Sequence, residues 1–249
     1  EPETDIENVG VVGSVVSTEG ISLTGAWYPY VEGLSYYSLT ATVPEGFTAI
    51  SEADVITEKE TPDGKEFSFH FPYPSEGMTL AAAKYVVGSD MEGDVEVYAY
   101  FFEEDATLAQ EYVDYTKRYL KMYEEMLGEY PFKRFSVVEN FLPTGYSMPT
   151  YTLLGRDVVR LPFIVETSLG HEILHQWFGN SVYGDPEGGN WLEGITNYLA
   201  DHLYKAQEGE GMLYRKKILM DYQSYVIPGK EIVLEDFRGR VDRATKAVG

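Results

Sequence analysis

The chain has 249 residues, with 41 Asp and Glu against 19 Lys and Arg, a formal net charge of −22, and no cysteine. This acidity argues against a nucleic-acid partner, because binding to phosphates requires a basic surface. The lack of cysteine excludes disulfides, thiol catalysis and every metal site that needs a thiolate ligand.

The first hundred residues predict short strands separated by turns that contain Pro and Gly. The clearest β patterns lie at residues 11–16, 36–43, 66–71 and 95–100. The pattern then becomes helical, and residues 106–127 predict a long helix with Asp105 as N-cap and Gly128 as C-cap. Its three- and four-residue spacing indicates one buried face, formed by Leu108, Tyr112, Tyr115, Tyr119, Met122 and Met126.

Further elements follow in the C-terminal half. Residues 135–138 predict a strand, 139–151 a loop, and 167–178 and 190–206 two helices joined by a Gly-rich turn. We therefore expect an α+β fold, with a β-rich domain over residues 1–94 and a second domain over residues 95–249.

The sequence gives little evidence about membrane insertion or export. No apolar run approaches the ~18–20 residues that span a bilayer, so we expect no membrane span. The chain begins at Glu1-Pro2 without an initiator Met or a signal peptide, which we interpret as the start of a mature or excised segment. The cell envelope or the extracellular space is slightly favoured over the cytoplasm, and the oligomeric state is left open.

The most informative motif is His171-Glu172-Ile173-Leu174-His175. Positions i and i+4 share one face of a helix, so both imidazoles can bind one cation. Glu172 follows the first ligand and can act on a water molecule as a general base without binding the metal itself. The motif therefore predicts a catalytic Zn²⁺ site.

A third ligand is needed, because catalytic zinc takes three protein ligands. Carboxylate is the remaining choice in a chain without cysteine, and Glu193, near the start of the next helix, is the best candidate. Glu187, in the intervening turn, is the rival. A third histidine at the metzincin spacing is excluded, since that position is Ser181.

These motifs resemble those of the M1 family, which includes aminopeptidase N and leukotriene A4 hydrolase. The stretch HEILHQWFGN (residues 171–180) is similar to the family's zinc signature, and WLEGITNY (191–198) to its second ligand-bearing helix. The resemblance implies a β-sandwich-like N-terminal domain followed by the first part of a thermolysin-like zincin domain. It also implies His171, His175 and Glu193 as zinc ligands and Glu172 as general base, although one residue fewer separates His175 from Glu193 than in the family.

The substrate-binding loop departs from the family pattern. Where the family has Gly-x-Met-Glu-Asn, this chain has Gly145-Tyr146-Ser147-Met148 followed by Pro149 and Thr150, so the carboxylate that binds a substrate's α-amine is replaced. Glu139 is the candidate substitute if the loop folds back. Gly145, Ser147 and Met148 are expected to bind a peptide as an extended edge strand.

The family's oxyanion-stabilising Tyr is expected immediately after Gly249, with Tyr222 and Tyr225 as alternatives, so this segment alone should be weak or inactive. The sequence thus predicts zinc-dependent hydrolysis of peptide or protein substrates. The alternative is an M1-like interaction scaffold that retains zinc without proteolysis.

Overall fold

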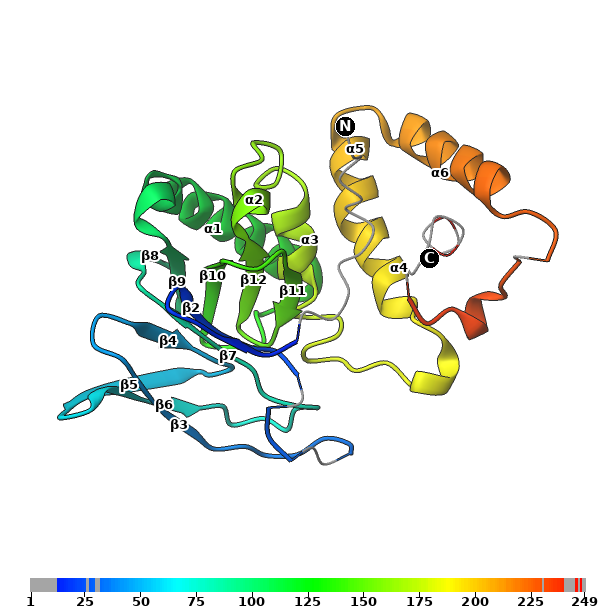
Figure 1. Cartoon of the computed structure of the whole chain (residues 1–249). Helices are drawn as coiled ribbons and strands as arrows, with labels where there is room; N and C mark the ends of the chain where they lie inside the picture. The colour runs from blue at the N-terminus through cyan, green and yellow to red at the C-terminus, as the bar shows by residue number, and fades with distance from the viewer. Residues whose placement is uncertain are drawn as a thin grey trace, which may run out of the picture. The chain divides into compact units, whose positions relative to one another are not determined.

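The computed structural model describes residues 13–25, 27–29, 32–229, 231–239, 245 and 247. The described residues separate into two compact units (Figure 1), one up to Glu166, here called the N-terminal unit, and one from Thr167 onward, the C-terminal unit. Both strands and helices are abundant, which confirms the α+β class. The predicted domain boundary at residue 94 stays a prediction.

The N-terminal unit contains three sheets, ordered β1-β2-β7-β4, β3-β6-β5 and β11-β12-β10-β9-β8. Their strands are β1 (Val15–Val16), β2 (Gly20–Leu23), β3 (Leu39–Val43), β4 (Thr48–Ile50), β5 (Val55–Thr61), β6 (Gly64–His70), β7 (Leu80–Ala83), β8 (Val86–Glu92), β9 (Val95–Phe101), β10 (Arg134–Asn140), β11 (Gly145–Met148) and β12 (Tyr151–Gly155). In the five-stranded sheet, β9, β10 and β12 are parallel, while β8 and β11 run antiparallel at its two edges. The predicted loop at 139–151 therefore contains a strand, β11. Residues 11 and 12 of the first predicted strand lie outside the described residues.

Strand β7 lies between two hydrophobic cores, because successive side chains of a strand point to opposite faces. Leu80 and Ala82 belong to a core shared with Phe67 and Phe69 of β6. Ala81, on the opposite face, belongs to a second core, which also contains Ile50, Tyr100, Val138, Tyr151 and Leu153. The two smaller sheets therefore form a sandwich, and the outer face of that sandwich packs on the five-stranded sheet.

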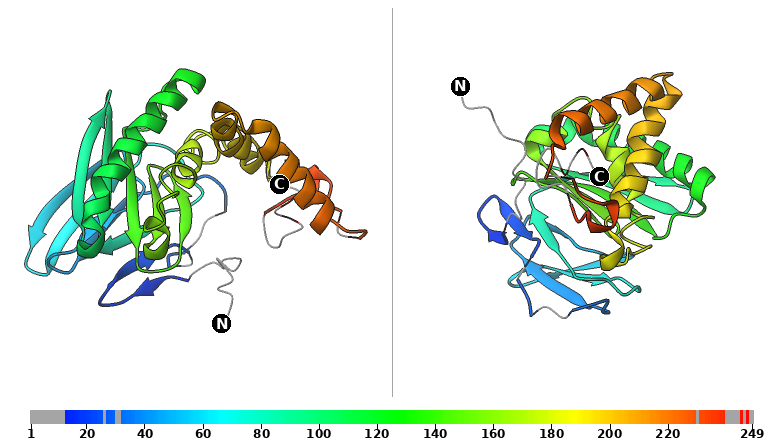
Figure 2. Two further views of the ribbon diagram at one scale, coloured as in Figure 1. Left: turned by 90° about the horizontal axis from the view of Figure 1, so that it is seen from above. Right: turned by 90° about the vertical axis from the view of Figure 1, so that its right-hand side faces the viewer.

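Helix α1 (Ala109–Leu127) follows the 3-10 turn η1 (Glu103–Leu108) and packs along β8 and β9 (Figure 2). A Cβ atom on Gly88 of β8 would lie 3.2 Å from the Cβ of Ala109, so glycine permits this close approach. The buried face of α1 includes Tyr112 and Tyr119, as predicted, but continues through Leu120 and Tyr123 rather than through the methionines. Met126 was wrongly assigned to this face, since it is exposed.

The two predicted caps of this helix had different outcomes. Gly128 is the C-cap, with a positive φ of 103° that glycine adopts without strain. The prediction that Asp105 is the N-cap was wrong, because Asp105 lies within η1. Its carboxylate instead accepts hydrogen bonds of 2.7–3.0 Å from Arg160. Arg160 follows the short helix α2 (Arg156–Val159).

The C-terminal unit is helical. It contains α3 (Ser168–Leu174), η2 (Pro186–Gly188), α4 (Trp191–Asn197), the π-helical turn η3 (Tyr198–His202), α5 (Leu203–Gln207), α6 (Gly211–Tyr225) and η4 (Leu234–Asp236). Helices α4, η3 and α5 follow one another without a break, as Figure 1 shows in yellow. The predicted helix 167–178 ends earlier, at Leu174, and the predicted helix 190–206 corresponds to this continuous run.

The described helices include none that is long and apolar enough to cross a membrane.

Candidate metal centre

Helix α3 holds both histidines of the motif on one face. Leu169, Gly170, Ile173 and Leu174 are its buried residues, whereas the side chains of His171 and His175 keep 12% and 16% of their surface exposed. His171 lies inside the helix and His175 caps its C-terminus in right-handed helical geometry. The i, i+4 spacing therefore brings the two imidazoles together, with their Nε2 atoms 3.2 Å apart.

The turn after α3 fixes the orientation of His175. The Nδ1 atom of His175 lies 3.0 Å from the carbonyl oxygen of Phe178. Two backbone hydrogen bonds, from Gly179 N–H to Val182 O and from Val182 N–H to Trp177 O, close this turn. Because a carbonyl oxygen only accepts hydrogen bonds, Nδ1 of His175 must carry a proton, which leaves Nε2 of the neutral ring as an acceptor.

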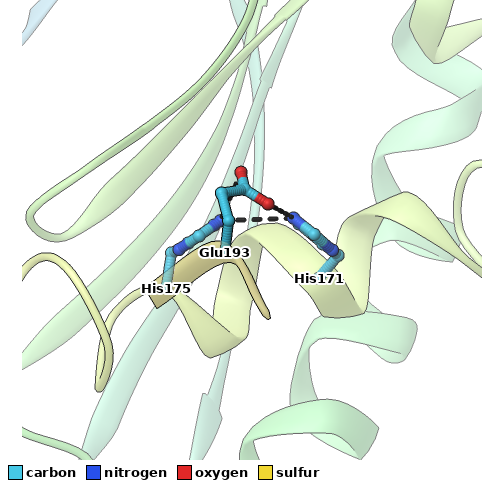
Figure 3. A group of neighbouring side chains, drawn as sticks. All are labelled: His171, His175 and Glu193. Carbon is cyan, nitrogen blue, oxygen red and sulfur yellow. Dashed lines mark hydrogen bonds and ion pairs between the residues drawn. The ribbon is translucent and has the colours of Figure 1, made fainter. Parts of the chain in front are cut away.

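Glu193 comes from the first turn of α4. The Asn190 side chain caps this helix by accepting the Glu193 N–H at 3.4 Å, and the Asn190 N–H donates to the Phe237 carbonyl at 2.7 Å. The Glu193 carboxylate oxygens lie 3.6 Å from Nε2 of His171 and 3.6 Å from Nε2 of His175. Figure 3 shows the three side chains pointing toward one another.

These three residues form a group whose ligand atoms lie within 4.8 Å of one another. Ligand atoms bound about 2.0–2.1 Å from a tetrahedral zinc ion stand about 3.3–3.4 Å apart. The separations of 3.2 and 3.6 Å lie close to that value. The donor set, two imidazoles and one carboxylate, is that of a zinc site with one open position.

Asp201, in η3, contacts the far side of the first histidine. Its Oδ2 atom lies 2.9 Å from Nδ1 of His171. A carboxylate accepts this proton, so Nε2 of a neutral His171 is also an acceptor. Sequence reasoning missed Asp201, because a residue eight positions after Glu193 in a regular α-helix would lie about 80° from the face of Glu193.

The electrostatics favour a positive charge among the three acceptors. Burial alone would lower the pKa of His171, but hydrogen bonds to Asp201 and Glu193 outweigh it and raise the pKa to about 10. Burial also raises the pKa of Glu172, against the opposing effect of the two histidines. A carboxylate with a raised pKa is suited to accept and release a proton near neutral pH.

The rival ligand and the oxyanion-stabilising Tyr predicted from the sequence also concern this unit. Glu187 lies in η2, where its side chain is exposed, and it does not belong to the convergent group. Asn197 donates its side-chain amide to the backbone carbonyl of Glu193 at 2.9 Å, which ties the ligand-bearing turn to the next turn of the helix. Tyr222 and Tyr225 lie exposed on α6, and residues 248 and 249 are outside the described residues.

The predicted substrate-binding residues lie in the N-terminal unit. Gly145, Ser147 and Met148 are on β11, which pairs with β12 and forms one edge of the five-stranded sheet. Glu139 lies on β10, in which every residue is buried, and its fully buried carboxylate accepts the Phe102 N–H at 2.7 Å. The role of all four in substrate binding stays a prediction.

Thr150, at the turn between β11 and β12, adopts the left-handed region with φ 73°. It is buried, and its hydroxyl accepts the Ala53 N–H at 3.2 Å. A β-branched residue in this region is rare, and such strain persists only where the surroundings impose it.

Comparison with known proteins identifies the relationship. Aminopeptidase B from Mus musculus is 30% identical over 176 residues, and the human enzyme is 31% identical over 173 residues. Each alignment covers 65% of this chain but 25% of the relative. Over this segment, the chain is similar to aminopeptidase B. It spans about a quarter of the length of the curated relatives it matches.

Solved structures show the same fold. The M1 zinc metallopeptidase from Deinococcus radiodurans superposes with a TM-score of 0.63 at 20% identity, covering 84% of this chain and 49% of that chain. A two-domain M1 zinc metallopeptidase E323A mutant bound to L-arginine gives a TM-score of 0.58 at 19% identity. No family model matches the chain.

Proposed function

We propose that this chain contains the zinc-binding part of an M1-type metallopeptidase, which hydrolyses peptide bonds with Glu172 as general base. One observation carries the proposal. The Nε2 atoms of His171 and His175 lie 3.2 Å apart, and each lies 3.6 Å from one of the two carboxylate oxygens of Glu193, in a partly buried site. Zinc is the metal whose ligand preferences match this set of two imidazoles and one carboxylate.

Each side chain has a defined part in the chemistry. When bound, zinc supplies Lewis acidity, which makes water nucleophilic at neutral pH. Glu172 takes a proton from the attacking water as its oxygen bonds to the scissile carbonyl carbon. The carbon–nitrogen bond then breaks, and Glu172 delivers the proton to the leaving amine.

Strand β11 supports a peptide as the substrate. It is a sheet edge with partly exposed residues, and an extended peptide can add to such an edge through backbone hydrogen bonds. Pro149 and Thr150 occupy the positions of the family's amine-binding Glu and its neighbouring Asn. Exopeptidase specificity would therefore require an ionised carboxylate from elsewhere, and Glu139, the candidate predicted from the sequence, is fully buried with a raised pKa.

Zinc binding is tested on the chain itself. Affinity is measured by competition with a chromophoric chelator for the wild type, His171→Ala, Glu193→Gln and Glu187→Gln. We expect the first two variants to lose zinc and Glu187→Gln, a matched substitution of an exposed carboxylate, to bind as the wild type does. Equal affinity of His171→Ala and the wild type would refute the site.

Hydrolysis is tested on the natural protein that contains this sequence. Glu172→Gln should retain zinc and reduce peptide hydrolysis by about 10²–10⁴-fold, the usual contribution of a general base. A wild-type protein that binds zinc and cleaves no peptide would instead favour the scaffold alternative, which the comparisons do not favour. Equal turnover of free and N-acetylated peptides, unchanged by Glu139→Gln, would exclude an amine-binding role of Glu139.

A further inference from the structure

Asp201 makes a contact that the zinc ligand set alone does not require. Its Oδ2 lies 2.9 Å from Nδ1 of His171, the ring nitrogen that faces away from His175 and Glu193. The side chain of Asp201 is 26% exposed, against 12% for His171. On the second histidine, the Phe178 carbonyl makes the equivalent contact at 3.0 Å. Each imidazole is thus contacted at Nδ1, the ring nitrogen that points away from the proposed zinc site.

The π-helical turn η3 explains how Asp201 reaches this position. Eight residues of α-helix rotate by about 800°, which would leave Asp201 about 80° from the face of Glu193. A π turn accommodates one additional residue, so the effective rotation is about 700°, or about 20° from that face. Asp201 lies within η3 (Tyr198–His202) and Glu193 one helical segment before it. The irregular turn therefore places both carboxylates toward His171.

We propose that Asp201 is a positioning residue of the zinc site, and that η3 is the local feature that places it there. By accepting the Nδ1 proton of His171, Asp201 fixes the ring orientation and the tautomer that presents the Nε2 lone pair to the metal, and it increases the basicity of the ligand. The inference rests on the proposed zinc site, but it concerns a residue that does not bind the metal.

The first test measures zinc affinity of the full chain for Asp201→Asn, Asp201→Glu and Glu208→Gln. Removing the carboxylate is expected to weaken zinc binding about 10–100-fold, the usual effect of losing such a partner. Asp201→Glu keeps the charge and should bind more tightly than Asp201→Asn. Glu208, at the end of α5, pairs with Lys205 and is the charge-matched control, for which affinity should not change.

A second measurement responds to orientation and not to overall folding. In the zinc-loaded protein, the Nδ1–H proton of His171 should give a slowly exchanging, downfield proton resonance that is lost in Asp201→Ala. The corresponding His175 proton, held by the Phe178 carbonyl, should remain. Loss of both resonances would indicate a general disturbance of the site and would overturn the specific role of Asp201.

The outcomes separate this inference from the proposed function. If Asp201→Asn binds zinc as tightly as Glu208→Gln while His171→Ala does not bind, the positioning role is wrong and the zinc site stands. If His171→Ala itself binds zinc as the wild type does, the zinc site is wrong and the role of Asp201 fails with it.

Discussion

Glu139 offers a quantitative test of the N-terminal unit. Its side chain is fully buried, with Oε2 accepting the Phe102 N–H at 2.7 Å and Oε1 3.8 Å from Nε of Arg156. Burial raises the pKa of Glu139 to about 8, and the adjacent Asp105 carboxylate adds to this shift. Asp105 keeps its charge, because hydrogen bonds from Arg160 lower its pKa. The folded protein therefore holds Glu139 protonated near neutral pH.

The consequence for stability has a definite sign. In the unfolded chain, Glu139 ionises near its ordinary pKa of 4.5, whereas in the folded chain it ionises near 8. Between these values the folded state binds more protons, so the free energy of unfolding falls as pH rises and levels off above about pH 8. At about 1.4 kcal/mol per pKa unit, the fall between about pH 5.5 and pH 8 is at most about 3 kcal/mol from this residue.

Glu139→Gln isolates this contribution, because the amide has similar shape and does not titrate. Urea unfolding of the wild type and the variant at about pH 5.5 and about pH 8 gives the difference in free energy at each pH. Relative to the wild type, the free energy of unfolding of the variant should increase by up to about 3 kcal/mol between about pH 5.5 and about pH 8. Glu104→Gln is the control, since it removes an exposed carboxylate that contacts the same Arg156. A difference that stays constant with pH would refute the buried proton.

Two further predictions concern the C-terminal unit. Gly189→Ala should destabilise it by at least about 1–2 kcal/mol, because φ is +76° and the added Cβ would lie 2.3 Å from the Leu234 carbonyl oxygen. Gly194→Ala in α4, where a Cβ would meet nothing within 4 Å, should instead stabilise by up to about 1 kcal/mol, and urea unfolding distinguishes the two. Zinc at about 100 times its dissociation constant should stabilise the chelator-treated wild type by about 2.7 kcal/mol, visible as a rise in the melting temperature. No such rise is expected for His171→Ala, and an equal rise there would place the bound metal elsewhere.

The sequence predicted the parts of the site that depend on regular helix geometry. The i, i+4 relation of His171 and His175 needs only one turn of helix, and α3 provides it before ending at Leu174. Glu193 could be predicted for two reasons. A chain without cysteine leaves carboxylate as the third ligand, and a short turn brings the next helix back toward the two histidines. The sequence already favoured Glu193 over Glu187, and in the structure the cap at Asn190 and the contact with Phe237 fix where α4 begins.

Features that depend on irregular backbone or on tertiary burial could not be predicted. Asp201 is eight residues from Glu193, and no local sequence pattern predicts the π turn that brings Asp201 onto the helix face of Glu193. Asp105 has the composition of an N-cap, yet its partner Arg160 lies 55 residues later in the chain. Glu139 follows an apolar run and was assigned to a loop, but pairing of β10 with both β9 and β12 buries it completely.

The arrangement of the two histidines has a physical consequence for how the site forms. His175 is oriented by the Phe178 carbonyl, within the turn that directly follows its own helix, so this half of the site depends on local structure. His171 depends on Asp201, and the third ligand is Glu193, both of which come from the continuous α4–η3 run. Only when that run packs on α3 do all three acceptors face one another. Metal binding and the packing of these helices are therefore linked, because only the packed arrangement brings the three ligand side chains to one cation.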